Sequence, residues 1–270
     1  MAEELQGQLD TLYPELDVTL IPTEYAGHAE KLTYDIAVRD KQPLIISVSG
    51  DGGYNEVING AAQAYAKGRS PITSLLPAGN ANDHYASVRR GDLLEAIQNE
   101  HISTIDLLLL AAGNEKRRAH SYIGFGMTPR IGQELTKTKL NRVTEKLVVF
   151  KGLLKPRSTP LIVDGQRRNY DSLTISNIER MAKVLTLSKV SKVDDGLFEI
   201  SSVEHRNRFS LLGFMVKAAT RGINANEQVA AFELKTVGST LVQLDGEVAT
   251  IPAHTTVRLS IDDNQLRCIR

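Results

Sequence analysis

The chain has no tryptophan, a single cysteine and few aromatic side chains. Aromatic residues make up 5% of its 270 residues, and the one cysteine is Cys268. Little aromatic surface is therefore available for stacking nucleic-acid bases. One cysteine cannot form an intramolecular disulfide, which favours a reducing, cytoplasmic setting. For Cys268 itself we expect a buried or inert thiol.

The chain also lacks an excess of charge of either sign and a long apolar run. Lys and Arg total 32, Asp and Glu total 32, and the formal net charge is zero. Without a basic excess we expect no nucleic-acid partner. The longest apolar run, residues 107–112, falls far short of the ~20 residues that a membrane-spanning helix needs. The polar, acidic N-terminus does not resemble a signal peptide. We therefore expect a soluble protein with at most peripheral membrane contact.

The first part of the chain alternates between helical and strand-like patterns. Helical periodicity occurs at residues 3–13, 28–40, 55–67 and 92–98, and strand-like runs at residues 16–21, 43–49 and 72–76. This alternation is typical of a mostly parallel sheet covered by helices. Asp92 has the residue type and position of a helix N-cap. The opening on a helix is unusual, because an open α/β sheet usually begins with a strand.

The second part of the chain is dominated by short strand-like runs with Gly and Asp between them. They lie at residues 147–150, 161–163, 172–175, 184–187, 197–203, 233–237, 242–244 and 256–261, and one helix is predicted at 210–220. Such spacing indicates a β-rich sandwich or barrel. We expect an α/β nucleotide-binding domain at 1–106 and a β-sandwich substrate domain at 107–270. The last residues are candidates for a return to the first domain.

Two glycine-containing loops follow apolar strands in the first part. One contains Gly50, Asp51, Gly52 and Gly53 and opens a helix. Glycine lets backbone amides approach a phosphate, and a helix N-terminus carries partial positive charge. An aspartate in such a loop makes sense if Mg²⁺ lies between it and the phosphate. The alternative is an ordinary turn between strand and helix.

The second loop, residues 77–83, contains Asn82 and Asp83 and also follows a buried strand. In parallel sheets ligands bind at the carboxyl ends of strands, so two such loops suit one nucleotide site. The alternative is a second ordinary loop, in which Asn82 and Asp83 cap a helix.

Five motifs, which follow one another along the chain in the family's order, resemble those of diacylglycerol kinase-like lipid kinases. The run GDGGYNEVING resembles the family's GGDGTxNEVxNG, and LPAGNANDHYA resembles its PxGTxNDFA. The other three are TEYAGHA, VDDGLF and LDGE, which resemble TxxxGHA, DDGxxx and xDGE. The glycine loop alone would also admit an NAD kinase or a phosphofructokinase. The combination with the NEVxNG continuation, the ND motif and DGE favours an ATP-dependent lipid kinase with a Rossmann-like first domain.

The resemblance implies a site for ATP in the cleft between two domains. The residues that it assigns to the nucleotide are Thr23, Gly50, Asp51, Gly52, Gly53, Asn55, Glu56, Asn80, Asn82 and Asp83. Among them, Asn80 stands where the family has a second threonine.

The resemblance also implies catalytic and metal-binding acids. Glu247 is the expected base for the lipid hydroxyl, assisted by Asp245, and Asp51 is the third expected catalytic residue. Asp195 is expected to hold a structural Mg²⁺ with backbone oxygens near Lys192 and Leu197. The alternatives are ordinary turns, since Asp-Gly is a strong turn signal.

The sequence departs from the family pattern in ways that bear on activity. The family's first strand and its Asn-Pro-x-Ser/Ala-Gly loop have no counterpart in the 270 residues. Ser49 replaces the first glycine of GGDGT, and Gly53 and Asn80 replace threonines. One lost hydrogen bond to a charged group costs about 1.5–3 kcal/mol. A catalytically impaired nucleotide- or lipid-binding relative is therefore the alternative to an active kinase.

Partners are predicted from the same resemblance. We expect a lipid substrate at a membrane surface, and a homodimer is a candidate assembly. The six histidines show no metal-ligand spacing, so surface or core positions are expected for them. One group of basic residues is a candidate for facing anionic headgroups, with an ordinary solvated surface as the alternative: Arg117, Arg118, Lys146, Lys151, Lys155 and Arg157.

Overall fold

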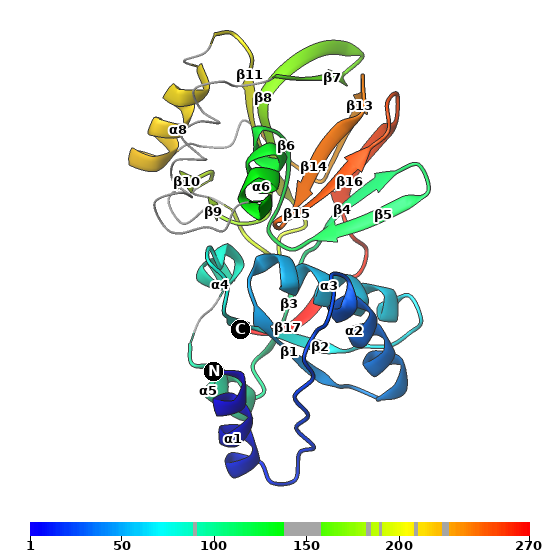
Figure 1. Ribbon diagram of the computed structural model, residues 1–270, viewed down its shortest axis with the longest axis vertical. Coiled ribbons are helices and arrows are strands. Elements are labelled where there is room, and N and C mark those ends of the chain that lie inside the picture. The colour runs from blue at the N-terminus through cyan, green and yellow to red at the C-terminus, as the bar shows by residue number, and fades with distance from the viewer. Residues whose placement is uncertain (89–90, 138–157, 182–184, 189–190, 208–209, 223–226) are drawn as a thin grey trace. The chain divides into compact units, whose positions relative to one another are not determined.

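The computed structural model describes residues 1–88, 91–137, 158–181, 185–188, 191–207, 210–222 and 227–270. The described chain forms two compact units. One comprises Met1–Thr104 together with Leu266–Arg270, and the other comprises Ile105–Gln265. The first is an α/β unit and the second is β-rich, as Figure 1 shows for each.

The first unit contains a four-stranded sheet in the order β1-β2-β17-β3. Its strands are β1 (Leu44–Ser49), β2 (Ile72–Pro77), β17 (Leu266–Ile269) and β3 (Ile102–Ile105). Its helices are α1 (Ala2–Leu12), α2 (His28–Arg39), α3 (Asp51–Tyr65), α4 (Asp83–Val88) and α5 (Leu93–Gln98). The β2 strand pairs in parallel with both β1 and β17. The predicted parallel sheet with covering helices is confirmed.

Alternating side chains of this sheet face two different sets of helices. Leu44 and Ile72 belong to a core cluster with Leu5 and Leu9 of α1 and Leu93 of α5. On the opposite face, the hydroxyl of Tyr54 in α3 lies 2.9 Å from that of Thr73. Because successive strand residues point to opposite faces, α3 covers the face opposite to α1 and α5.

The strand predicted at residues 16–21 is not formed, and this prediction was wrong. These residues belong to none of the ladders of the described chain, and β1 is an edge of its sheet. Leu16, Leu20 and Ile21 are exposed. An alternating pattern supplies strand propensity, but a strand forms only where a neighbour accepts its hydrogen bonds.

The second unit is built on an eleven-stranded sheet, and its strands pair antiparallel. Nine strands follow the order β15-β14-β6-β8-β7-β13-β16-β4-β5, and β11 and β12 extend from β8. Their bounds are β4 (Leu108–Ala112), β5 (Glu115–Ala119), β6 (Tyr122–Gly126), β7 (Thr159–Val163), β8 (Gln166–Ser176), β11 (Phe198–Glu204), β12 (Glu227–Val229), β13 (Ala231–Thr236), β14 (Thr240–Leu244), β15 (Glu247–Ile251) and β16 (Thr256–Ile261). A separate two-stranded ladder joins β9 (Arg180–Met181) and β10 (Leu185–Thr186).

One apolar core joins distant strands of this large sheet. Leu108 of β4, Phe125 of β6, Phe198 of β11 and Leu259 of β16 belong to the same cluster. Strands that are far apart in the order of the sheet therefore share this core, which is consistent with the β-rich second domain that the sequence predicts. Helix α6 (Met127–Lys137) packs on β6 and β14, and α8 (Ser210–Thr220) packs on β10 and β11. The strand predicted at 147–150 lies outside the described residues.

Candidate nucleotide and catalytic site

The two glycine-containing loops of the first unit touch each other through their backbones. Gly50 follows β1 and is the N-cap of α3, and Gly79 follows β2. A β-carbon added at Gly79 would lie 2.3 Å from the Gly50 Cα, and one added at Gly50 would lie 2.9 Å from the Gly79 Cα. Because side chains cannot be accommodated at such distances, glycine is required at both positions. The sequence predicted these loops at one edge of the sheet, and the structure brings them into contact.

Asp51 connects the two loops through its carboxylate. Its Oδ2 accepts a hydrogen bond from the Asp83 amide at 3.1 Å, and its Oδ1 accepts one from the His84 amide at 3.1 Å. These are amides of the first turn of α4, which have no partner within their own helix. Asp51 is only 9% exposed. Its carboxylate therefore fixes the start of α4 against the start of α3.

The second loop is closed by Asn82. Its Oδ1 accepts from the Gly79 amide at 3.0 Å, and its Nδ2 donates to the Gly79 carbonyl oxygen at 2.9 Å. Asn82 adopts a positive φ of 54°, which asparagine tolerates better than most residues. Asn80, in the middle of the loop, is exposed.

Glu56 connects the glycine loop helix to the start of α2. Its Oε1 accepts from the Gly27 amide at 2.7 Å, and its Oε2 accepts from the Ala29 amide at 3.1 Å. This interaction joins the NEV and GHA motifs, which lie 27 or more residues apart. Thr23, just before this turn, is exposed. The prediction that Thr23 and Glu56 contact nucleotide stays a prediction.

Two further residues of the NEVING motif have packing roles. Asn55 is buried, and its Oδ1 lies 3.1 Å from the Nδ2 of Asn59. At Gly60 an added β-carbon would lie 2.3 Å from the Glu30 carbonyl oxygen, so glycine allows α2 and α3 to pack closely. Gly52 and Gly53 lie in the first turn of α3.

The DGE motif of the second unit forms a tight hairpin turn. Asp245 and Gly246 connect β14 to β15 with φ values of 48° and 105°. Two consecutive positive φ values are typical of a type I′ turn, for which Asp-Gly is a preferred pair. Glu247, the first residue of β15, is exposed.

Asp245 holds this turn from the interior. It is fully buried, and its carboxylate accepts hydrogen bonds from the amides of His120, Ser121 and Tyr122 at 2.6–3.0 Å. The buried His120 ring lies beside it, with Nε2 3.4 Å from Oδ2. The structure thus favours a role for Asp245 in positioning the turn that carries Glu247. Its assistance in catalysis stays a prediction.

The predicted metal site is a turn at residues 193–197. Asp195 is exposed, and its carboxylate accepts from the Leu197 amide at 3.1 Å and from Gln228 at 3.3 Å. An exposed carboxylate next to main-chain carbonyls is an oxygen donor set of the kind that Mg²⁺ takes. No group of three or more His, Cys, Asp or Glu side chains among the described residues is arranged to hold a metal. A metal at Asp195 and Lys192 would therefore depend on carbonyl and water oxygens.

Asp106 also supports this turn, and sequence reasoning missed it. It is buried, its Oδ2 accepts from the Gly196 amide at 2.7 Å, and its Oδ1 accepts from Gln265 at 2.7 Å. Its own amide donates to the Val193 carbonyl oxygen at 2.7 Å. The signal in the sequence was a lone carboxylate between Ile105 and a run of leucines. A carboxylate buried among apolar residues stays charged only where hydrogen-bond donors surround it.

The expectations for the single cysteine and for the basic residues are resolved in part. Cys268 is buried in β17, and burial raises the pKa of its thiol to about 11, so it is protonated at neutral pH.

Arg118 is mostly buried and forms an ion pair with Asp262 at 2.6 Å, which does not suit it for binding headgroups. Arg117 is exposed on β5. The other four basic candidates, Lys146, Lys151, Lys155 and Arg157, lie outside the described residues.

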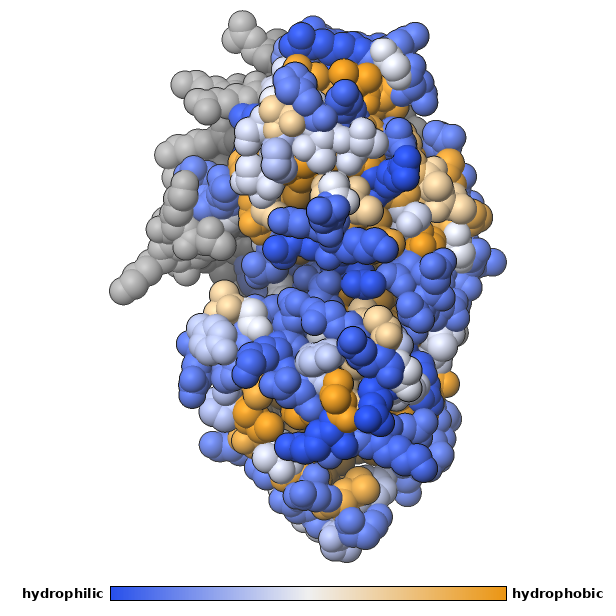
Figure 2. Space-filling view, turned by 90° about the vertical axis from the view of Figure 1, so that its right-hand side faces the viewer, coloured by the Kyte–Doolittle hydropathy of each residue, from blue (hydrophilic) through white to orange (hydrophobic). Residues whose placement is uncertain are grey.

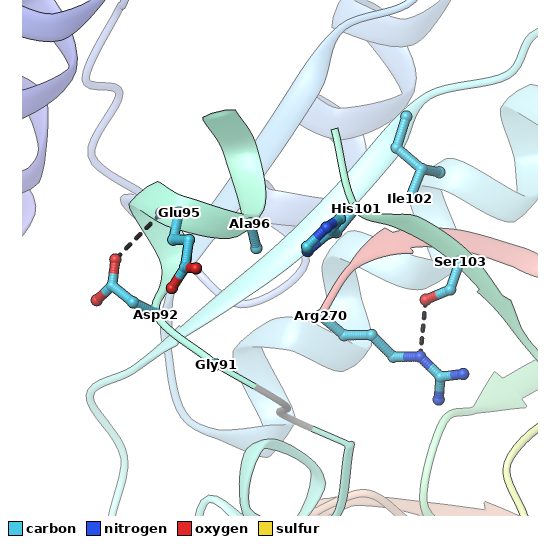
Figure 3. A pocket seen from close by; sticks show the side chains of 8 residues that line it. All are labelled: Gly91, Asp92, Glu95, Ala96, His101, Ile102, Ser103 and Arg270. Carbon is cyan, nitrogen blue, oxygen red and sulfur yellow. Dashed lines mark hydrogen bonds between the residues drawn. The ribbon is translucent and has the colours of Figure 1, made fainter. Parts of the chain in front are cut away.

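A cavity of about 470 Å³ lies elsewhere in the first unit, beside α5, β3 and β17. Figure 3 shows Arg270 reaching Ser103, with Nε 2.7 Å from Oγ, and the His101 ring between them and Glu95. The cavity shares no lining residue with the two glycine-containing loops. We therefore place the candidate nucleotide site at the loops, where the motifs and the strand ends coincide.

Part of the amino-acid sequence matches a known protein family. The matched part forms most of the first unit and the start of the second. Residues 2–110 match the model of the diacylglycerol kinase catalytic domain. This segment belongs to the diacylglycerol kinase catalytic domain family. The match covers the GHA, glycine-loop and ND motifs, which are the motifs that the structure joins through Glu56 and Asp51.

Relatives extend the similarity to most of the chain. A diacylglycerol kinase of Staphylococcus aureus strain bovine RF122 is 24% identical over 254 residues, which covers 86% of this chain and 76% of the relative. A solved structure of a candidate diacylglycerol kinase from Bacillus anthracis strain Sterne has a TM-score of 0.73 at 21% identity, covering 97% of this chain and 88% of that one. A solved diacylglycerol kinase from the same strain has a TM-score of 0.66 at 17% identity, with coverages of 97% and 87%. The two-unit fold is therefore that of diacylglycerol kinase-like proteins.

Proposed function

We propose that the protein is an ATP-dependent lipid kinase that transfers the γ-phosphate to the hydroxyl of diacylglycerol or a similar lipid. The observation that carries this proposal is the backbone contact between Gly50 and Gly79. It joins two motif loops at the carboxyl ends of two neighbouring parallel strands, where α/β sheets bind their ligands.

The loops supply what a triphosphate requires. The first-turn amides of α3 point away from the helix and have no intrahelical partner. Together with the helix dipole they favour an anionic phosphate. Gly52 allows close approach of that phosphate to the backbone, and the amide of Gly53 is a proposed donor to it. Phosphoryl transfer depends mainly on such positioning and on neutralisation of charge.

Glu247 is the proposed general base. Its carboxylate accepts the proton of the lipid hydroxyl as that oxygen forms a bond to the γ-phosphorus, and ADP leaves with the electrons of the broken bond. The type I′ turn exposes Glu247, while the buried Asp245 fixes the turn. A positioned general base contributes about 10²–10⁴-fold to a rate.

Magnesium has two proposed sets of ligands on this chain. Asp195, with carbonyl oxygens near Lys192 and Leu197, would hold a structural ion in the second unit. Asp51 would help to hold a second one at the phosphates. When bound there, Mg²⁺ neutralises phosphate charge. The exposed Asn80 and Thr23 are the proposed side-chain contacts to the nucleotide.

The test is transfer of labelled phosphate from ATP to detergent-dispersed diacylglycerol in the presence of Mg²⁺. We expect labelled phosphatidic acid from the wild-type protein. Glu247→Gln is expected to lower kcat by about 10²–10⁴-fold. Glu115→Gln, at an exposed position of β5, is the matched control and is expected to retain the wild-type rate. Full activity of the Glu247 variant would overturn the assignment of the base.

A catalytically impaired nucleotide- or lipid-binding protein is the second candidate. One observation favours it: the carboxylates of Asp51 and Glu56 are each engaged with two backbone amides. Binding of Mg-ATP without transfer to diacylglycerol, sphingoid or prenol lipids would support this candidate over the kinase.

We further propose that the lipid is reached at the cytoplasmic surface of a membrane. Within the described part of the chain, no helix is long and apolar enough to cross a bilayer. On the face shown in Figure 2, hydrophobic side chains form several separate groups among hydrophilic ones. Cosedimentation with vesicles containing diacylglycerol tests this proposal, and the candidate homodimer is tested by sedimentation equilibrium.

A further inference from the structure

The glycine loop departs from its family pattern at two positions that meet in space. The family loop reads GGDGT, whereas this chain has Ser49 at the first position and Gly53 at the fifth. A β-carbon added at Gly53 would lie 2.7 Å from the Ser49 Cβ and 2.8 Å from the Ser49 Oγ. The Cβ of Ser49 is fixed by the backbone, so a change of rotamer cannot relieve the closer contact. In this backbone only one of the two positions can therefore carry a side chain.

The side-chain space shared by positions 49 and 53 contains a hydroxyl group both in the family pattern and in this chain. In the family pattern a threonine at the fifth position would supply it, and in this chain Ser49 does. Ser49 is the last residue of β1, half-buried, and lies at the start of the loop. We infer that Ser49 is the hydroxyl that contacts the nucleotide phosphates in this protein, and that Gly53 is glycine because Ser49 occupies its side-chain space.

The hydrogen bonds of Ser49 suit this role. Its hydroxyl donates to the Gly50 carbonyl oxygen at 3.0 Å and lies 2.7 Å from the Ser47 Oγ. With the one hydroxyl proton of Ser49 directed to Gly50, Ser47 is the donor in the second contact. Ser47 therefore holds the Ser49 oxygen in place, while rotation about the C–O bond redirects the Ser49 proton to a phosphate oxygen.

The other residues of the glycine loop, and Asn82 of the second loop, are less suited to donate a hydroxyl hydrogen bond to a phosphate. Glycine at positions 50, 52 and 53 has no side chain. The carboxylate of Asp51 is an acceptor and receives the amides of Asp83 and His84. The amide group of Asn82 is bound to the backbone of Gly79 at both ends. Ser49 is thus the hydroxyl donor of the glycine loop.

The inference rests on the proposed function, because it requires that the loop binds ATP. It has one structural consequence that is independent of ATP. Gly53→Thr alone should fold poorly, because two side chains would compete for one space. Ser49→Gly/Gly53→Thr should restore the melting temperature, because the space is again occupied once.

The experiment measures two quantities for the wild type and for each variant: the dissociation constant of Mg-ATP, by titration calorimetry, and the melting temperature. Ser49→Ala keeps the β-carbon and loses only the hydroxyl, so we expect about tenfold to a hundredfold weaker binding. Ser49→Gly/Gly53→Thr should bind within about threefold of the wild type. Ser49→Gly/Gly53→Val is the matched control, since valine has the shape of threonine without the hydroxyl, and it should bind as weakly as Ser49→Ala.

Three results would overturn the inference in distinguishable ways. Equal affinity of Ser49→Ala and wild type removes the role of Ser49 and leaves the kinase proposal intact. Equal affinity of the threonine and valine double variants would show that a hydroxyl at position 53 does not replace the hydroxyl of Ser49. A wild-type protein that binds no Mg-ATP overturns the inference together with the proposed function.

Discussion

At the scale of single residues, acidic side chains in the motifs organise the backbone. Asp51 and Glu56 each accept hydrogen bonds from two backbone amides, and Asp245 accepts from three. Hydrogen bonds to a charged acceptor are worth more than neutral ones. These acids are therefore required for the shape of the loops, whatever they also do for a ligand.

Glu56→Ala is predicted to loosen the start of α2. The variant leaves the Gly27 and Ala29 amides without their acceptor, and we expect the free energy of unfolding to fall by about 1.5 kcal/mol. Urea denaturation followed by circular dichroism measures the change. Glu24→Ala, at an exposed position of the same turn, is the control and should change it by less than about 0.5 kcal/mol. Equal stability of the two variants would show that the bonds of Glu56 are not needed.

Glu199 predicts a dependence of stability on pH. Burial raises the pKa of its carboxyl above the ordinary value of 4.5, and a hydrogen bond from Ser191 acts in the opposite direction. A raised pKa means that the folded state binds the proton more tightly than the unfolded state does. This stabilisation is present in full below pH 4.5 and is lost as the pH rises through the raised pKa.

The comparison of wild type with Glu199→Gln isolates this effect. We expect the wild-type free energy of unfolding, relative to that of the variant, to decrease from pH 4 to pH 7. Denaturation at several pH values measures it. A difference that does not change with pH would contradict the raised pKa.

At the scale of elements, glycine decides how closely strands and helices approach. The loops after β1 and β2 meet at Gly50 and Gly79, and α2 meets α3 at Gly60. By contrast, a β-carbon at Gly7 in α1 would meet nothing within 4 Å. The same substitution should therefore have opposite effects at different glycines.

Gly79→Ala is predicted to separate the two loops and to weaken both folding and Mg-ATP binding. Its β-carbon would lie 2.3 Å from the Gly50 Cα, and such backbone incompatibility costs more than about 1 kcal/mol. Gly7→Ala, in an exposed helical position, should stabilise the protein by about 0.5–1 kcal/mol. Melting temperatures of both variants test the pair. A Gly79→Ala protein as stable as Gly7→Ala would show that the loops do not need their contact.

Elements with strong local signals were predicted well from the sequence. The structure has β1 at Leu44–Ser49, α8 at Ser210–Thr220 and β16 at Thr256–Ile261, as expected. Asp92 is the N-cap of α5, accepting from the Leu94 and Glu95 amides. The predicted helix at 55–67 in fact begins at Asp51, because the fold tolerates two glycines in its first turn.

Elements and contacts that depend on distant partners were not predictable in this way. Residues 16–21 have a strand pattern without a ladder. The strand β17 was not predicted, because its four residues give too short a pattern, although the last residues were candidates for a return to the first domain. The contacts of Asp51 with α4 and of Asp245 with residues 120–122 cross 32 and 123 or more positions. A pattern within one sequence window contains no information about such partners.

At the scale of the whole molecule, the first unit is discontinuous in the chain. Strand β17 lies between β2 and β3, so residues 266–269 complete a sheet whose other strands lie before residue 106. The hydroxyl of Ser74 donates to the Ile269 carbonyl oxygen at 3.1 Å, and Tyr65 accepts from the Arg267 amide at 3.0 Å. The α/β unit therefore depends on a segment that follows the whole second unit.

A chain that ends at Gln265 is predicted to lose the folded first unit. Removal of β17 would leave β2 and β3 without their shared neighbour and would expose the core around Leu93 and Ile72. Hydrogen exchange should show protection lost in α3 and retained in the second unit. Arg270→Ala, which keeps β17, is the control. Protection of α3 in the shortened chain would show that β17 is dispensable.

The position of β17 also has a consequence for biosynthesis. A ribosome that has completed residues 1–104 must still make the 161 residues of Ile105–Gln265 before β17 emerges. Domains generally fold in the order in which they are synthesised, but here the unit that begins first cannot close its sheet first. During translation the β-rich unit has its strands available while the nucleotide loops still lack a complete sheet behind them. The nascent chain therefore acquires its candidate ATP site only after the second unit has been made.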